Sequence, residues 1–155
     1  MAQAQKQVRI IEPLERFVNR INLVGCYARV SSDSEDQLNS YNNQVDFYES
    51  FVNSLENSKL VKIYTDEGIT GTRMDKRDGF LQMIEDCRKG LINTIITKSI
   101  SRFARNITET LSVVRELKSI GVSVYFMTEK INTAKMGSEM MLAVYAACAE
   151  IESKA

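Results

Sequence analysis

Short apolar runs alternate along the chain with longer segments of helical periodicity. The runs at residues 23–30, 60–65, 94–100 and 123–126 have the length and composition of buried strands. Apolar side chains recur at helical spacing over 36–55, 79–89, 107–120 and 137–154, and Gly90 and Gly121 end two of these segments. The alternation predicts an α/β fold with a mostly parallel, four- to five-stranded sheet flanked by helices.

Polar residues follow three of the predicted strands. Ser31 follows the first, a predicted loop over 66–78 follows the second, and a predicted loop over 101–106 follows the third. The carboxyl ends of parallel strands meet at one edge of a sheet, where ligand sites gather. We therefore expect the Ser31 hydroxyl to lie among four guanidinium groups, those of Arg29, Arg77, Arg102 and Arg105.

The composition narrows the chemistry. The chain has no histidine, which excludes Ser-His-Asp and Cys-His hydrolases and histidine-ligated metal sites. Cys26, Cys87 and Cys148 are far apart in the sequence, which indicates reduced thiols and disfavours a zinc site. We therefore expect neither a metal nor a cofactor. A hydroxyl among arginines suits phosphoryl transfer, because guanidinium groups bind phosphate oxygens and neutralise the charge of the transition state.

Charge is balanced overall but uneven along the sequence. The 20 basic and 20 acidic residues give a formal net charge of zero, which by itself argues against nucleic-acid binding. However, the stretch 88–105 carries basic residues and no acidic one, and Arg73, Lys76 and Arg77 form a second basic cluster upstream. A solvated surface is the ordinary explanation of such clusters. No apolar stretch approaches the roughly 20 residues that span a bilayer, and no secretory signal is evident.

Three motifs resemble those of the resolvase/invertase family of serine recombinases. The first is YARVSS at 27–32, the second comprises DEGITG at 66–71 and KRDGF at 76–80, and the third is KSISRFARN at 98–106. They occur in order with compatible spacing, and the resemblance extends from about residue 22 to residue 154. The sequences of the segment 40–44 and of the third motif most resemble those of the large serine recombinases of mobile elements.

The resemblance implies roles for the matched residues. Ser31 would attack a DNA phosphodiester and form a 5′-phosphoserine link, while the four arginines would hold the scissile phosphate. Supporting polar positions match Gln44, Thr70 and Ser101, and candidate DNA contacts are Arg73, Lys76 and Lys98. Many small resolvases carry an aspartate where this chain has Ser101. If that aspartate supplies a proton, Asp66 or Glu67 could substitute for it, and the sequence selects neither.

The resemblance also implies partners and a place in the cell. The partner would be double-stranded DNA, bound without a metal by a homodimer at each site and by a tetramer at synapsis. The reaction would integrate or excise a mobile element in the bacterial cytoplasm, in association with the nucleoid and not with a membrane.

Three regions are expected along the chain. Residues 1–20 would be an N-terminal extension, in which Ile10, Leu14, Phe17 and Val18 form an amphipathic helical pattern. Residues 21–135 would be the catalytic domain, and residues 136–155 the start of a long interface helix. The apolar face of that helix is expected to comprise Met140, Met141, Val144, Cys148 and Ile151. The DNA-binding portion of the family would follow it.

Two other functions remain open on the sequence. A serine-type transposase would use the same nucleophile with a relaxed choice of target. A catalytically inactive regulatory module that binds nucleic acid or protein would be expected to lack site residues, whereas Ser31 and the four arginines are present. A flavodoxin-like nucleotide switch is disfavoured, because no glycine-rich phosphate loop or acidic cluster follows a strand.

Overall fold

The fold is an α/β sandwich built on one five-stranded sheet. The computed structural model describes residues 20–31, 34–68, 77–104, 106–135, 137 and 139–143, without the side chains of 31, 34–40 and 107. The strands are β1 (Asn22–Ser31), β2 (Ser58–Gly68), β3 (Thr94–Thr97), β4 (Ser123–Phe126) and β5 (Ile131–Asn132). Their order is β2-β1-β3-β4-β5, and only β5 runs antiparallel to its neighbour. The predicted fold class is therefore confirmed.

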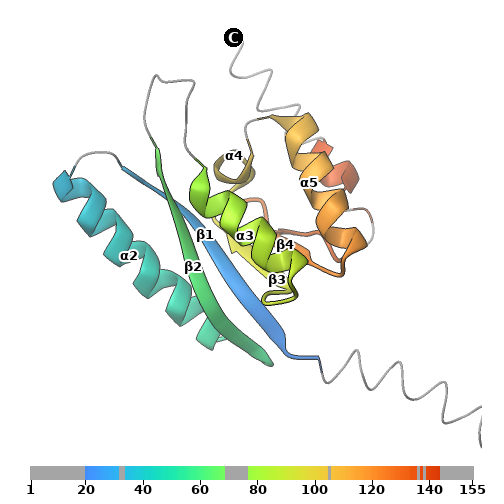
Figure 1. Cartoon of the computed structure of the whole chain (residues 1–155), viewed down its shortest axis with the longest axis horizontal. Coiled ribbons are helices and arrows are strands. Elements are labelled where there is room, and N and C mark those ends of the chain that lie inside the picture. Colours follow the sequence, from blue (N-terminus) through green and yellow to red (C-terminus); the bar gives the residue numbers. More distant parts are fainter. Residues whose placement is uncertain are drawn as a thin grey trace, which may run out of the picture.

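Helices cover both faces of the sheet (Figure 1). Helix α2 (Ser34–Asn53) lies on one face, and α3 (Asp78–Arg88), α4 (Ile100–Phe103) and α5 (Ile107–Ser119) lie on the other. Successive side chains of a strand point to opposite faces, so β1 contributes to two cores. One core joins Val24, Cys26 and Ala28 to Tyr48 and Val52 of α2. The other joins Tyr27 to a larger cluster that includes Phe80, Met83, Phe103 and Phe126.

Some elements differ from those expected. Residues 66–68, predicted as a loop, are the end of β2, where they pair with residues 29–31 of β1. Residues 98–100 were predicted as strand, but β3 ends at Thr97, and residues 101–103 belong to the short helix α4 instead of a loop. The Ile100 N–H donates to the Glu129 carboxylate at 3.1 Å, which holds the start of α4 against the turn after β4. The two-residue strand β5 was not predicted.

The C-terminal helical segment packs in a different register from the one expected. Met140 and Met141 were expected on its apolar face, but they are 75% and 49% exposed, whereas Leu142 is fully buried. Leu142 joins the core cluster on the α3 and α5 side of the sheet. Val144, Cys148 and Ile151 lie outside the described residues, as do residues 1–19. No helix in the described ranges is long and apolar enough to cross a membrane.

Candidate active site

The first two motifs lie where β1 and β2 extend beyond the rest of the sheet. β3 pairs with β1 only as far as Tyr27, opposite Thr97, whereas β2 accompanies β1 to Ser31, opposite Gly68. The Ser31 backbone is therefore at the carboxyl-terminal tip of the paired strands. Helix α4 follows β3 and contacts β1, which brings the third motif beside the first.

Side chains of α2 and β3 support β1 at the point where its pairing with β3 ends. The Tyr27 carbonyl accepts hydrogen bonds from the Tyr48 hydroxyl at 3.0 Å and from the Thr97 hydroxyl at 3.3 Å. Two residues further, the Arg29 carbonyl accepts a hydrogen bond from Gln44 Nε2 at 3.3 Å. Arg29 is half-buried, and strand alternation puts it on the same face of β1 as Tyr27. Gln44 thus contacts the strand that carries Arg29 and Ser31.

Asp66 joins β1, β2 and the start of α3. Its Oδ1 accepts a hydrogen bond from the Gly79 N–H at 2.7 Å, and its Oδ2 accepts from the Phe80 N–H at 3.0 Å and from the Tyr27 hydroxyl at 2.7 Å. A carboxylate is well placed there, because the first N–H groups of a helix have no partner within the helix. Burial, and then the hydrogen bond to Asp66, raises the pKa of Tyr27. Asp66 is 8% exposed and engaged in this network, whereas Glu67 is exposed.

Arg77 lies at the junction of β2 and α3 and faces inward. Its Nη1 donates to Glu109 Oε1 at 2.7 Å, and its Nη2 donates to the Phe103 carbonyl. The guanidinium carbon lies 3.8 Å from the centre of the Phe80 ring and 5.9 Å from that of Tyr27. Arg77 therefore joins residues of all three motifs. The burial of most of this arginine side chain was not predicted from the sequence.

The third motif presents its polar side chains on the surface. Lys98, Ser101 and Arg102 are exposed, and the hydroxyl oxygens of Ser99 and Ser101 are 3.1 Å apart. Five of the candidate residues or side chains lie outside the described part of the chain: the Ser31 side chain, Thr70, Arg73, Lys76 and Arg105. Among the described residues, no cluster of His, Cys, Asp and Glu is arranged to hold a metal ion.

Sequence reasoning missed Glu109, the carboxylate partner of Arg77. An acidic residue in the first turn of a helix is favourable for the helix itself, and Glu109 occupies that position in α5. Its presence there has an ordinary explanation, so no sequence signal singled it out.

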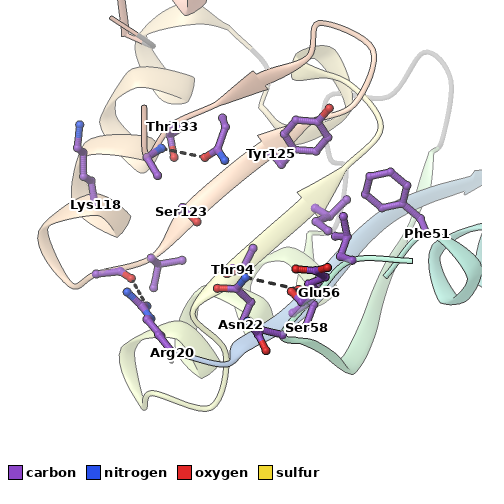
Figure 2. A pocket seen from close by; sticks show the side chains of 18 residues that line it. Arg20, Asn22, Phe51, Glu56, Ser58, Thr94, Lys118, Ser123, Tyr125 and Thr133 are labelled. Carbon is purple, nitrogen blue, oxygen red and sulfur yellow. Dashed lines mark hydrogen bonds between the residues drawn. The ribbon is translucent and has the colours of Figure 1, made fainter. Parts of the chain in front are cut away.

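A cavity of about 720 Å³ lies at the opposite edge of the sheet, at the amino-terminal ends of the strands (Figure 2). Asn22, Thr94 and Ser123 line it from the strands, and Phe51 and Tyr125 form part of its apolar wall. None of the residues proposed from the motifs lines this cavity. The motif residues that the structure describes therefore lie toward the carboxyl-terminal ends of the strands, away from this cavity.

The sequence of this chain is similar to those of known resolvases. Residues 24–155 match the family described as "Resolvase, N terminal domain". The transposon Tn552 resolvase of Staphylococcus aureus is 31% identical over 134 residues, which cover 81% of this chain and 57% of that protein. The Tn552 DNA-invertase BinR of the same organism is also 31% identical over 134 residues, which are 59% of its length. The chain thus spans less than two thirds of the length of these relatives.

Solved structures share the fold. A resolvase family site-specific recombinase from Streptococcus pneumoniae is 28% identical, with a TM-score of 0.66 over 86% of this chain and 89% of the other. The N-terminal catalytic domain of TP901-1 integrase is 20% identical, with a TM-score of 0.59 over 86% of this chain and 98% of the other, a likeness of fold alone. With three motifs in order, a family match over most of its length and this fold, the chain belongs to the resolvase family of serine recombinases.

Proposed function

We propose that this chain is the catalytic part of a site-specific DNA recombinase in which Ser31 is the nucleophile. The observation that carries the proposal is the meeting of the three motifs at one edge of the sheet. β1 ends at Ser31 beside β2, α4 contacts β1, and Arg77 bridges from the start of α3 to Phe103 of α4. The two curated relatives are named a resolvase and a DNA-invertase of a transposon, which supports recombination as the reaction.

The chemistry is a phosphoryl transfer that conserves bond energy. The Ser31 hydroxyl gives up its proton as its oxygen attacks phosphorus, and the bond to the 3′ oxygen breaks. That oxygen leaves with the electron pair and takes up a proton, so it becomes a 3′-hydroxyl. The DNA is held as a 5′-phosphoserine, and attack by a 3′-hydroxyl of another strand reverses the step and frees the serine. Arg29, Arg77, Arg102 and Arg105 neutralise the phosphate oxygens as charge develops on them. Fixed guanidinium charges make a metal ion unnecessary for this task.

The remaining candidate residues support this centre. Gln44 holds the carbonyl of Arg29 and so steadies the strand that carries the nucleophile. Thr70 and Ser101 are proposed supporting hydroxyls, and Arg73, Lys76 and Lys98 are proposed contacts to the DNA backbone. Lys98 is exposed, as such a contact requires.

We place the reaction on double-stranded DNA of a mobile element in the bacterial cytoplasm, in association with the nucleoid. The full-length protein would bind each site as a homodimer and form a tetramer at synapsis. Within the chain, residues 21–135 form the catalytic domain, residues 1–20 precede it as an extension, and residues 136–155 begin an interface helix. The transposon origin of the two relatives supports the mobile-element assignment.

The experiment uses the full-length protein and a suicide DNA substrate that carries a nicked recombination site. A covalent protein–DNA adduct is sought on a denaturing gel for the wild type, Ser31→Ala and the matched control Ser32→Ala. The proposal expects an adduct with the wild type and Ser32→Ala and none with Ser31→Ala. An adduct that persists in Ser31→Ala would place the nucleophile elsewhere. No adduct with any variant, on a verified site, would favour a non-catalytic binding module, and equal adducts on unrelated DNA would favour a transposase.

A further inference from the structure

We propose that Glu109 is a positioning residue for the recombination reaction, acting through Arg77. Its carboxylate holds the Arg77 guanidinium where that group fixes the second motif against the third. This inference rests on the proposed function, since it assigns a part in that reaction to a residue outside the motifs.

The surroundings of Arg77 explain why it needs an anion. Its side chain is 12% exposed, and its guanidinium carbon lies 3.8 Å from the centre of the Phe80 ring. The aromatic ring faces and the Phe103 carbonyl offer the guanidinium only partial negative charges. The Glu109 carboxylate carries a full negative charge, and its Oε1 lies 2.7 Å from Arg77 Nη1. A mostly buried cation that loses its charged partner is costly to keep in place. Without Glu109, we expect Arg77 to turn toward solvent.

Glu109 is itself held firmly. It lies in the first turn of α5, and its backbone N–H donates to the side-chain oxygen of the N-cap residue Asn106 at 2.8 Å. The hydroxyl and the N–H of Thr110 both donate to the Asn106 carbonyl, at 2.9 and 3.0 Å. The carboxylate therefore starts from a capped, rigid helix end, as a group that orients another side chain requires.

The consequence for the site follows from what Arg77 contacts. Its Nη2 donates to the carbonyl of Phe103, the last residue of α4, and Arg102 precedes that residue directly. The segment between Phe103 and Glu109 contains the Arg105 position. Arg77 and Glu109 thus hold both ends of the segment that follows α4. A displacement of about 1 Å in reacting groups can slow a reaction about a hundredfold. Loss of the contacts that Arg77 makes with Glu109 and with the Phe103 carbonyl is therefore expected to slow cleavage.

The test measures single-turnover cleavage of the suicide substrate by the full-length protein, at saturating DNA and per folded molecule. Glu109→Ala is expected to lower the cleavage rate about a hundredfold and to leave DNA affinity within about twofold, because Glu109 is proposed to orient Arg77 and not to contact the DNA itself. Glu109→Gln keeps an oxygen that can accept the Arg77 hydrogen bond. It should retain a rate within about tenfold of the wild type, as expected when only the charge of a hydrogen-bond acceptor is removed.

A matched control lies on the same helix. Glu116 pairs with Arg88 at 2.6 Å, but both side chains are about half exposed, so the pair is expected to contribute little. Glu116→Ala should therefore cleave at the wild-type rate. Equal rates for Glu109→Ala and Glu116→Ala would overturn the inference, as would equal loss in Glu109→Gln and Glu109→Ala. If Glu109→Ala does not fold, Glu109→Asp replaces it, because it keeps the carboxylate but shortens its reach to Arg77. It should then cleave more slowly than the wild type, and a wild-type rate for both Glu109→Asp and Glu109→Gln would overturn the inference.

The two proposals fail in different ways. If the wild type forms no Ser31-dependent adduct, the proposed function is wrong. If that adduct forms and Glu109→Ala forms it at the wild-type rate, only the role of Glu109 is wrong.

Discussion

Gly79 lies where the start of α3 comes closest to β2, and replacing it by alanine should be costly. A Cβ built there would lie 2.3 Å from the Thr65 carbonyl oxygen and 3.0 Å from Asp66 Oδ1. The helix start must then move by about 1 Å to restore an ordinary van der Waals contact with that oxygen. Such overpacking costs about 1–3 kcal/mol. The movement also stretches the 2.7 Å hydrogen bond from the Gly79 N–H to Asp66.

A hydrogen bond to a charged group contributes about 1.5–3 kcal/mol, and the better helix propensity of alanine returns about 1 kcal/mol. We therefore expect Gly79→Ala to lower the free energy of unfolding by about 3 kcal/mol. For a chain of this size, that corresponds to a fall in Tm of about 10 °C.

Urea and thermal unfolding measure this loss, and Gly90→Ala is the control. Gly90 has a φ of 78° but no atom within 4 Å of a Cβ. Its replacement should cost only the strain of a left-handed residue, about 1 kcal/mol. A loss for Gly79→Ala equal to or smaller than the loss for Gly90→Ala would refute the close approach of α3 to β2.

Three further predictions concern pH and helix capping. Burial raises the pKa of Tyr27 and Tyr64, so the stability they contribute is present below their unfolded pKa of about 10 and lost as the pH rises above it. An absorbance titration should show both phenols ionising only with unfolding, and ionisation in the folded protein near pH 10 would contradict this. The Tyr64 hydroxyl donates to Asp86 at 2.5 Å and lowers the pKa of that carboxyl. The stability contributed by Asp86 is therefore present above an unfolded pKa of about 3.9 and lost as the pH falls below it. Tyr64→Phe should lower the free energy of unfolding by about 2 kcal/mol at pH 7. In urea unfolding measured at several pH values, the variant should lose less of this free energy on acidification than the wild type. Asn106→Ala should cost about 1 kcal/mol and Asn106→Asp should not, and equal stabilities would show that the cap does not matter.

The hydrophobic pattern alone predicted the helices and strands in which buried apolar side chains recur at regular spacing. β1, β4, α3 and α5 lie close to their predicted bounds, because each places a regular apolar stripe in a core. Residues 66–68 were missed as strand, since an aspartate, a glutamate and a glycine suggest a loop. They are extended because Asp66 is buried as the cap of α3, and that role depends on an element distant from it in the sequence.

The motifs identified candidate residues but not their orientation. They did not reveal that the Arg77 side chain contacts Glu109, the Phe103 carbonyl and the Phe80 ring. Those partners come from α3, α4 and α5, so only the folded arrangement reveals them. The same holds for Met140 and Met141, which were expected on the apolar face of the C-terminal helix and are exposed, whereas Leu142 beside them is buried.

The most direct test of the account is to locate the covalent bond between protein and DNA. The adduct of the full-length protein would be digested with nuclease and trypsin, and the peptide that begins at Val30 would be sequenced by mass spectrometry. The proposed mechanism predicts a nucleotide joined through its 5′ phosphate to Ser31. A nucleotide on Ser32 or on any other residue, or one joined through its 3′ phosphate, would contradict it.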